Sequence, residues 1–476
     1  MSSEPGSVKK VEIRSSPLER FSHLVDRGTS TELEQRIASL RAALGGRPLW
    51  NVNSTARGGG VAELLGSLLP YERGAGIDAR WLVIEGSPEF FATTKKIHTL
   101  LHGVEPPEGK LTDEDRSHYE SATASNVKAL AGLIRAGDVA ILHDPQTLGL
   151  VPPLVERGVH VVWRAHIGVD DPNVTARGAW AFLRQYLAPA SAYVFSRQAY
   201  VWEGLDPACV RVIAPCIDPF ATKNMDSIAD SVDAILQASG LLAGHAGEPL
   251  FTRGDGTHGR VVRKATILGP ALPTDARIVV QVSRWDRLKD PIGVMEAFAS
   301  HIAPPTDACL VLAGPAANSV TDDPEQPEVL NELTQRREAM PKEMRDRTVI
   351  AQLPMEDPEE NAVLVNALQR RADVVVQKSL AEGFGLTVAE AMWKERPVVA
   401  TRVGGIQDQI EDGRSGILVD DPRDLDAVGR AVVRVLEDRS LEERLGHEAR
   451  DRVIKNFISP RHLVEESRLI TEVLAH

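Results

Sequence analysis

Short, nearly continuous hydrophobic runs alternate with helical stretches along most of this chain, and this alternation limits the possible folds more than any other feature. The runs of the first series are Leu49–Asn53, Arg80–Glu85, Asp138–Leu142, His160–Trp163, Ala192–Ser196 and Arg211–Ala214. Runs of this kind are typical of parallel strands covered on both faces. Because the strands alternate with helices, we expect βαβ units and an α/β fold with a doubly wound sheet.

The alternation weakens between about residues 222 and 275, where we expect a helix and loops, and then restarts. The runs of the second series are Ile278–Val282, Cys309–Ala313, Thr348–Gln352, Asp373–Gln377, Pro397–Thr401 and Ile417–Val419. Two series of similar size predict two Rossmann-like domains with a cleft between them, and ligands of such sheets lie at the carboxyl ends of the strands. We place these domains at residues 46–250 and 251–459.

The two ends of the chain lie outside these series. Residues 1–45 form an N-terminal extension whose first 17 residues are polar and expected to be frayed. A helix in this extension is predicted by hydrophobic residues at helical spacing, namely Leu33, Ile37, Leu40 and Leu44. A last helix, at about residues 460–476, is expected to cross back to the N-terminal domain.

Charge and composition exclude several classes of protein. The chain has 67 acidic and 54 basic residues and a formal net charge of −13, so it lacks the electrostatic footprint usual for nucleic-acid binding. Its three cysteines form no CxxC pair, which argues against a disulfide framework or a zinc site. No apolar stretch approaches the roughly 18 residues that span a bilayer, and the N-terminus has no signal-peptide core. We therefore expect a cytoplasmic protein that binds neither nucleic acid nor membrane.

The segment from Glu382 to Glu390 is the strongest candidate for a ligand site. It follows a predicted strand and opens a helix, and Gly383 and Gly385 flank Phe384 within it. Glycines let a backbone approach a ligand closely, and the free N–H groups of Leu386 and Thr387 at the helix start would attract an anion. The two carboxylates can grip separate parts of one long ligand. An ordinary loop with a solvated Glu and a helical Glu has the same spacing.

Two basic residues, Arg284 and Lys289, lie five apart just past the predicted strand at 278–282. An Arg fork and a Lys point charge suit a diphosphate. Basic turn residues are usually solvated, but the position at the carboxyl end of a strand favours a ligand site.

Three consecutive glycines, Gly58, Gly59 and Gly60, precede a predicted helix after the strand at 49–53. Such a loop admits a phosphate or sugar, or is simply a tight turn. The loop is neither GxGxxG nor a P-loop, which disfavours an NAD site.

Polar residues also follow two other predicted strands. His166, after the strand at 160–163, can hydrogen-bond a sugar hydroxyl, although a lone His is more often structural. Asp144, after the strand at 138–142, either binds acceptor hydroxyls or caps a turn. The Asp424-Leu-Asp426 sequence is interpreted as helix N-terminal charge rather than a metal site.

Together these motifs resemble the retaining glycosyltransferases of GT-B fold in family four, and within them the trehalose glycosyltransferring synthases. The matching segments, in chain order, are Asn53-Ser-Thr, Gly58–Glu63, Arg80–Gly86, His143–Gln146, Val162–Ile167, Pro215–Pro219, Val282–Asp286, the pair Glu382 and Glu390, and Glu390–Lys394. The similarity spans about residues 48–472. It implies transfer of glucose from a nucleoside-diphosphate glucose, such as UDP-glucose or ADP-glucose, to free glucose in a reversible reaction that makes α,α-trehalose.

The resemblance also implies roles for individual residues in this transfer. Arg284, Lys289, Leu386 and Thr387 would hold the diphosphate, Gly59 and Gly60 would lie near it, and Glu390 would bind the ribose. Glu382, Gly383, Phe384 and Gly385 would bind the donor sugar, and His166 would contact it near the reacting carbon. Acceptor contacts would come from Asp144, Gln146 and Arg164. A tightly bound cofactor is not expected, Mg²⁺ is optional, and a homodimer is plausible for the family. The family pattern places an acid soon after the His-Ile pair, whereas this chain has Gly168-Val169 before Asp170.

Other activities fit the same motifs. A retaining trehalose phosphorylase, which uses inorganic phosphate, shares the anion site. A related family-four enzyme with another acceptor, such as a glycerate, and a sugar-nucleotide epimerase are further alternatives. A catalytically silent nucleotide-sugar sensor is disfavoured because Glu382, Glu390, Arg284, Lys289 and His166 are all present.

Overall fold

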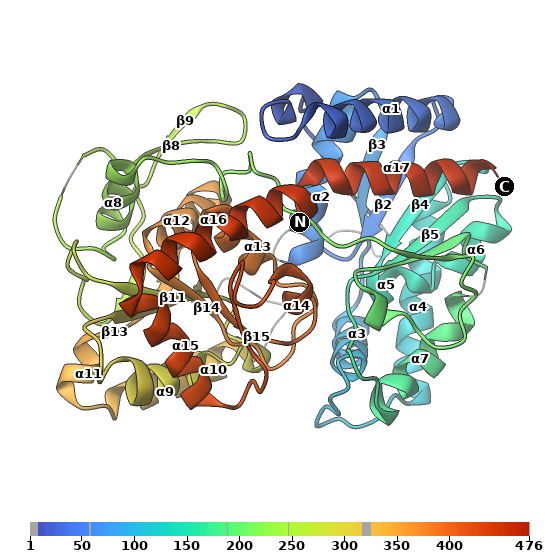
Figure 1. The fold of residues 1–476 in the computed structure, drawn as a ribbon. Coiled ribbons are helices and arrows are strands. Elements are labelled where there is room, and N and C mark those ends of the chain that lie inside the picture. The colour runs from blue at the N-terminus through green and yellow to red at the C-terminus, as the bar shows by residue number, and fades with distance from the viewer. Residues whose placement is uncertain (1–7, 57–58, 188, 246, 317–324, 476) are drawn as a thin grey trace. The chain divides into compact units, whose positions relative to one another are not determined.

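The computed structural model describes residues 8–56, 59–187, 189–245, 247–316 and 325–475. The chain divides into two compact units (Figure 1). Unit 1 comprises Met1–Ile217 and Phe457–His476, and unit 2 comprises Asp218–Asn456. Each unit is built around its own seven-stranded sheet, one strand more than each series of hydrophobic runs predicts.

The sheet of unit 1 has the strand order β1-β3-β2-β4-β5-β6-β7. Its strands are β1 (Lys9–Val11), β2 (Leu49–Asn53), β3 (Ala79–Val83), β4 (Val139–His143), β5 (His160–Ala165), β6 (Ala192–Phe195) and β7 (Val210–Val212). All neighbours pair in parallel except β1, which runs antiparallel to β3. Every residue of β2 and β4 is buried, which confirms that helices cover both faces of the sheet centre.

The helices of unit 1 include one from each end of the chain. They are α1 (Arg27–Leu44), α2 (Gly60–Gly74), α3 (Pro88–Leu101), α4 (Asp113–Leu130), α5 (Asp144–Leu148), α6 (Val151–Glu156), α7 (Val174–Leu187) and α17 (Ser459–Ala475), with short 3₁₀ turns at Leu18–Phe21 and Gln198–Tyr200. α1 and α17 pack side by side (Figure 1). The Ile217 N–H donates to Phe457 O at 2.9 Å, and Ser459 N–H returns a bond to Ile217 O at 3.1 Å. The predicted return of the last helix to the N-terminal domain is thus confirmed.

The sheet of unit 2 has the order β10-β13-β12-β11-β14-β15-β16. Its strands are β10 (Thr266–Leu268), β11 (Ile278–Val282), β12 (Cys309–Pro315), β13 (Thr348–Leu353), β14 (Val374–Gln377), β15 (Val398–Thr401) and β16 (Ile417–Val419). Only the β10–β13 pair is antiparallel within this sheet as described. A separate antiparallel pair is formed by β8 (Leu250–Thr252) and β9 (His258–Arg260).

The helices of unit 2 fill the connections between these strands. They are α8 (Ala229–Ala238), α9 (Pro291–Ala297), α10 (Glu325–Glu338), α11 (Lys342–Asp346), α12 (Pro358–Arg371), α13 (Leu386–Trp393), α14 (Ile406–Gln409), α15 (Leu425–Glu437) and α16 (Arg439–Asn456), with short turns η3 (Arg287–Lys289) and η4 (Phe298–Ile302). Asp424 caps α15 by accepting from Ala427 N–H at 2.8 Å, which confirms that the Asp-x-Asp sequence marks a helix start.

Two expectations differ from the structure. The division between the units falls at residues 217/218 instead of 250/251, because α8 packs on α12 and Asn366 bonds the carbonyl groups of Thr222 and Met225. The extension expected to be frayed contains β1, whose residues pair with β3. A short edge strand tolerates polar residues such as those of β1, so hydrophobicity does not reveal it.

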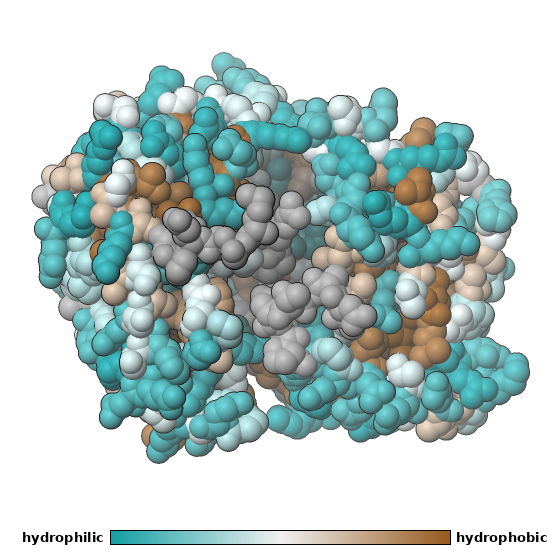
Figure 2. Space-filling view, turned by 180° about the vertical axis from the view of Figure 1, so that it is seen from behind, coloured by the Kyte–Doolittle hydropathy of each residue, from teal (hydrophilic) through white to brown (hydrophobic). Residues whose placement is uncertain are grey.

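Hydrophilic residues cover most of the face drawn in Figure 2, and hydrophobic residues form smaller patches on it. Within the described ranges, no helix is long and apolar enough to cross a bilayer. Cys209 is half-buried, Cys216 and Cys309 are buried, and all three are free thiols.

Candidate functional site

The loops that follow β11 and β14 bring together two predicted site residues of unit 2. These strands are parallel neighbours, so their carboxyl ends lie at the same edge of the sheet. The Lys289 Nζ lies 2.5 Å from Glu382 Oε2, and both side chains are largely buried. The structure therefore joins two motifs that are 93 residues apart in the chain. A partly buried ammonium–carboxylate pair of this kind presents both a cation for phosphate and an acceptor for sugar hydroxyls.

Buried polar residues that sequence reasoning missed hold the Lys289 loop in place. Gln281, on β11, donates from Nε2 to the Lys289 carbonyl at 3.0 Å. Lys378, which is 1% exposed, forms an ion pair with Asp290. Asp290 has φ 46°, and its carboxylate accepts from Gly293 N–H at 3.0 Å, so it also caps α9. An Asp is one of the few non-glycine residues that adopts this backbone conformation readily.

The N-terminus of α13 forms the anion-binding feature that the sequence predicts. Gly385 precedes the helix with φ 84° and ψ 63°, a left-handed conformation that glycine adopts without strain. Among the described residues, no group accepts a hydrogen bond from the backbone N–H of Leu386 or Thr387. The Thr387 hydroxyl donates to Gln377 Oε1 at 3.1 Å, which ties the helix start to the end of β14. Free N–H groups at a helix start favour a bound anion.

Glu390 lies one turn inside α13 and is 2% exposed. Its Oε1 is 3.1 Å from Lys223 Nζ, whereas its Oε2 is buried without a hydrogen-bond partner in the described structure. A buried carboxylate oxygen without a donor is costly, so this atom suits a ligand hydroxyl. Lys223, which the sequence motifs did not reveal, supplies the partner charge.

Two further residues of these motifs differ in exposure: Arg284 is partly exposed and Phe384 is buried. The Arg284 side chain is 42% exposed, with its guanidinium 3.7 Å from Asp286. Phe384 is buried, and its carbonyl accepts from Gln409 Nε2 at 2.5 Å. Arg284 is thus partly exposed beside Asp286, whereas Phe384 helps to anchor the loop before α13.

In unit 1, three neighbouring parallel strands bring polar side chains together. Asn51 lies on β2, His143 ends β4, and His166 follows β5. His143 Nδ1 lies 3.0 Å from His166 Nε2, and His143 Nε2 lies 2.9 Å from Asn51 Oδ1. Burial, with the nearby Arg164 charge, lowers the pKa of His143 to about 3 and that of His166 well below its usual value. Both rings are therefore neutral at pH 7.

Asp144 is tied to the same group. It has φ 62°, and its Oδ1 accepts from His166 N–H at 2.8 Å. Burial raises the pKa of the Asp144 carboxyl to about 7, the range in which a side chain transfers protons near neutral pH. Gln146, two residues further on, has a buried Oε1 without a partner in the described structure. Both residues fit the predicted hydroxyl-binding role.

The glycine loop after β2 is described from Gly59 onward, and Gly58 lies outside the described residues. Gly59 caps α2 with φ 141°, and Gly60 is the first helical residue. Only glycine adopts this backbone conformation at low cost, so the start of α2 requires a glycine at Gly59.

Arg164 requires a correction. It is 2% exposed, and its guanidinium donates to His462 Nε2 at 2.8 Å and to the Ile213 carbonyl at 3.2 Å. It also forms an ion pair with Glu466 at 3.5 Å. Arg164 thus joins β5 to α17 inside unit 1 instead of presenting its guanidinium to an acceptor sugar.

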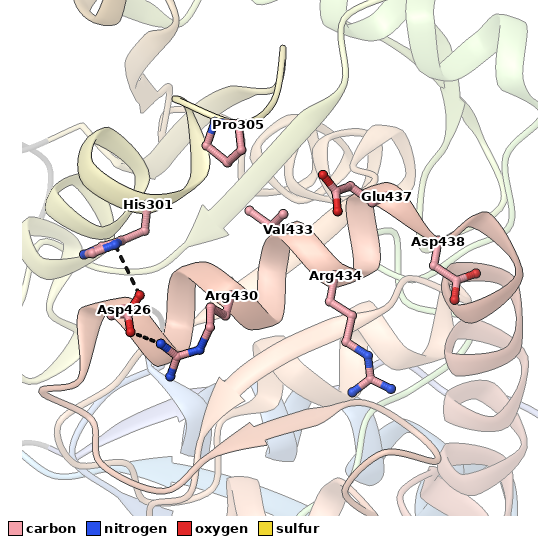
Figure 3. Close-up of a pocket in the computed structure, with 8 residues that line it drawn as sticks. All are labelled: His301, Pro305, Asp426, Arg430, Val433, Arg434, Glu437 and Asp438. Carbon is pink, nitrogen blue, oxygen red and sulfur yellow. Dashed lines mark ion pairs between the residues drawn. The ribbon is translucent and has the colours of Figure 1, made fainter.

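A surface pocket of about 530 Å³ lies elsewhere in unit 2, between η4 and α15 (Figure 3). Its lining comprises His301, Pro305, Asp426, Arg430, Val433, Arg434, Glu437 and Asp438. Asp426 forms ion pairs with both His301 and Arg430. None of the predicted site residues lines it.

Comparisons with known proteins agree with this architecture. Residues 264–452 match the family described as glycosyl transferases group 1, and residues 51–202 match the trehalose synthase N-terminal domain. The solved α,α-trehalose 6-phosphate synthase of Burkholderia multivorans superposes with a TM-score of 0.66 at 15% identity, covering 90% of this chain and 97% of that one. The two parallel sheets and the group 1 match define a GT-B glycosyltransferase.

Relatives define the family more narrowly. Trehalose synthase of Thermococcus litoralis is 36% identical over 413 residues, which is 87% of each chain. That of Rubrobacter xylanophilus is 32% identical over 450 residues, 93% of this chain and 94% of its own. The chain belongs to the trehalose synthase family. A trehalose phosphorylase from Grifola frondosa is also similar, at 28% identity over 84% of this chain and 54% of its own length.

Proposed function

We propose that the protein transfers glucose from a nucleoside-diphosphate glucose to free glucose and forms α,α-trehalose with retention at the anomeric carbon. The observation that carries this proposal is the group at the carboxyl ends of β11 and β14: Lys289 paired with Glu382 beside the unbonded amides of α13. Membership of the trehalose synthase family supports trehalose as the product.

In this proposal the groups of unit 2 bind the donor. Arg284, Lys289 and the N–H groups of Leu386 and Thr387 bind the diphosphate. Glu390 Oε2 accepts a hydrogen bond from a ribose hydroxyl, and Glu382 accepts from hydroxyls of the transferred sugar. In unit 1, His166 contacts the donor glucose, while Asp144 and Gln146 bind the acceptor.

The chemical step breaks the bond between the anomeric carbon and the diphosphate oxygen, so negative charge develops on the leaving group. Preorganised cations and amides stabilise this charge without reorganisation. The acceptor hydroxyl attacks from the leaving-group side, and its proton passes to a diphosphate oxygen. This route retains the anomeric configuration and needs no covalent intermediate on a carboxylate.

The test is incubation with a panel of nucleoside-diphosphate glucoses and free glucose, with trehalose and released diphosphate followed by NMR. Equal amounts of α,α-trehalose and nucleoside diphosphate support the proposal. A glucosyl adduct trapped on Glu382 or another carboxylate would overturn the proposed route.

A trehalose phosphorylase is the second candidate, because a relative of this chain carries that name. Inorganic phosphate would occupy the same anion-binding groups. It has no ribose, however, and so leaves the buried Glu390 Oε2 without a donor. Formation of glucose 1-phosphate from trehalose and phosphate without nucleotide would favour this candidate.

A further inference from the structure

Asn51, His143 and His166 form a continuous series of hydrogen bonds from the middle of β2 through the end of β4 to the residue after β5. Asn51 is 1% exposed and His143 is 2% exposed, so water does not compete for their bonds. The ring planes of the two histidines differ by 19° and their nearest nitrogens are 3.0 Å apart, so the rings meet edge to edge. His166 is the half-buried end of this series.

The direction of these bonds follows from the chemistry of each atom. The Asn51 Oδ1 is only an acceptor, so His143 Nε2 must carry the hydrogen. Since His143 is neutral, its Nδ1 then has a lone pair and accepts the hydrogen of His166 Nε2. A neutral His166 with its hydrogen on Nε2 has an unprotonated Nδ1. Among the described residues nothing hydrogen-bonds this Nδ1, which leaves it to accept from a ligand.

We propose that Asn51 and His143 are positioning residues that fix the ring and the tautomer of His166, so that Nδ1 accepts a hydrogen bond from a substrate hydroxyl. The assignment rests on the proposed function, in which His166 contacts the donor sugar. It refines that function by making His166 an acceptor toward the sugar and not a donor. It also explains why a polar pair, Asn51 within β2 and His143 at the end of β4, is buried.

A single rotation of the Asn51 amide gives a clear alternative. If Nδ2 pointed at His143, it would donate to Nε2, and every bond in the series would reverse. His166 would then carry its hydrogen on Nδ1 and would donate to the substrate. Among the described residues Nδ2 has no hydrogen-bond partner, so the observed orientation places the hydrogen bond of the Asn51 side chain on Oδ1.

The first experiment reads the tautomer directly in the full-length protein without substrate. Histidine labelled with ¹⁵N gives distinct long-range ¹H–¹⁵N correlations for the two tautomers, and His166→Gln identifies the His166 signals. We expect hydrogen on Nε2 of both rings. Hydrogen on Nδ1 of His166 overturns the proposal. Because no substrate is needed, this outcome is independent of whether the protein makes trehalose.

The second experiment tests whether the hydrogen bonds that link Asn51, His143 and His166 affect turnover. Asn51→Leu removes the acceptor at nearly equal size, whereas Asn51→Asp keeps an acceptor toward His143 Nε2. We expect N51L to mix the His166 tautomers and to lower kcat on the order of tenfold to a hundredfold, by analogy with partners that orient ligating histidines. KM should change little, and N51D should restore the Nε2 tautomer and part of the lost kcat.

Folding is checked by comparing the thermal unfolding of N51L and N51D with that of the natural protein. Equal kcat in N51L and the natural enzyme overturns the positioning role even where the tautomer is as expected. Loss of kcat in N51D equal to that in N51L, with both folded, also overturns it, because the retained acceptor then has no effect. If the natural protein forms no trehalose, the proposed function fails while the tautomer result still stands.

Discussion

At the scale of single residues, the site depends on pairs of charged side chains that only the folded chain brings together. Lys289 and Glu382 come from different motifs and meet at 2.5 Å. Lys289 thus forms an ion pair with Glu382, and in the proposed function it also binds the diphosphate. Arg287, two residues earlier, is 53% exposed and pairs with Glu332 on the surface at 3.1 Å. The two cations differ in burial and in what they touch.

Replacing Lys289 should therefore lower activity far more than replacing Arg287. Lys289→Ala removes one preorganised cation from the developing diphosphate charge, which costs about 3–4 kcal/mol of transition-state stabilisation, or on the order of a hundredfold to a thousandfold in kcat. Arg287→Ala, the matched control, removes an exposed ion pair worth roughly 0–1 kcal/mol of stability and should leave kcat almost unchanged. Steady-state kinetics on both variants checks this. Equal losses in the two variants contradict the assigned role.

Asp144 should give the reaction a pH dependence near neutrality. Burial raises its pKa to about 7, so the carboxyl is largely protonated at pH 6 and ionised at pH 8. If the ionised carboxylate accepts a hydrogen bond from a hydroxyl of the acceptor glucose, kcat/KM for glucose should rise as the pH passes through about 7. Asp144→Asn should lower kcat/KM and abolish this rise. A pH profile that keeps the same rise in the variant would assign the titration to another group.

At the scale of elements, the strands were predictable because each central strand is a short, mostly hydrophobic run covered on both faces, and such runs have few other interpretations. The predicted run Leu49–Asn53 coincides with β2, and Ile278–Val282 coincides with β11. Polar edge strands such as β1 have no such signature. The hydrogen bond between Asn51 and His143 was not predictable either. It requires β2 and β4 to be neighbours in the sheet, and the hydrophobic runs do not reveal the strand order.

Gly385, at the start of α13, can be compared with Gly413, another glycine of unit 2 with a positive φ. Gly385 has φ 84°, and a Cβ there would lie 3.2 Å from both Glu382 Cγ and Ile406 Cγ1. Gly413 has φ 73° with nothing within 4 Å of its added Cβ. Alanine at either site costs roughly 1–2 kcal/mol of backbone strain, so both variants should lose similar stability.

Only Gly385→Ala should weaken nucleotide binding, because it displaces Glu382 and the amides of Leu386 and Thr387. We expect its Kd for a nucleoside diphosphate to rise by about tenfold to a hundredfold, since one charged hydrogen bond contributes roughly 1.5–3 kcal/mol. Titration calorimetry measures this, and Gly413→Ala should bind like the natural protein. A tight-binding Gly385→Ala would mean that the α13 start does not contact the diphosphate.

At the scale of the whole chain, the polypeptide leaves unit 1 at Ile217 and returns to it at Phe457. The return depends on a buried polar cluster between α2, β5 and α17. Arg164 bonds His462 and pairs with Glu466, and Glu72 of α2 lies against Glu466. Burial, followed by the charge of Glu466 and a hydrogen bond to it, raises the pKa of Glu72 well above its usual value. The pKa of Glu466 is lowered to about 2: burial opposes this, but the neighbouring His462, the Arg164 charge and the hydrogen bond from Glu72 outweigh it.

This cluster predicts how the stability of unit 1 depends on pH. Folded Glu72 keeps its proton above pH 4.5, whereas the unfolded chain releases it, so this group's contribution to the free energy of unfolding decreases as pH rises from about 4.5 toward the folded pKa. Glu72→Gln is neutral at every pH and its amide can still donate to Glu466. The variant should therefore gain stability relative to the natural protein between pH 5 and pH 8, as measured by urea unfolding at both values.

The neighbouring Glu465 provides the control for this prediction. It is half-buried, pairs with Arg461 and is not part of the buried cluster. Glu465→Gln should change stability by a similar small amount at pH 5 and pH 8, because exposed ion pairs contribute roughly 0–1 kcal/mol. A stability difference between Glu72→Gln and the natural protein that is the same at both pH values would mean that Glu72 is ionised in the folded chain. The attachment of α17 would then depend on two adjacent carboxylates held by Arg164 and His462 alone.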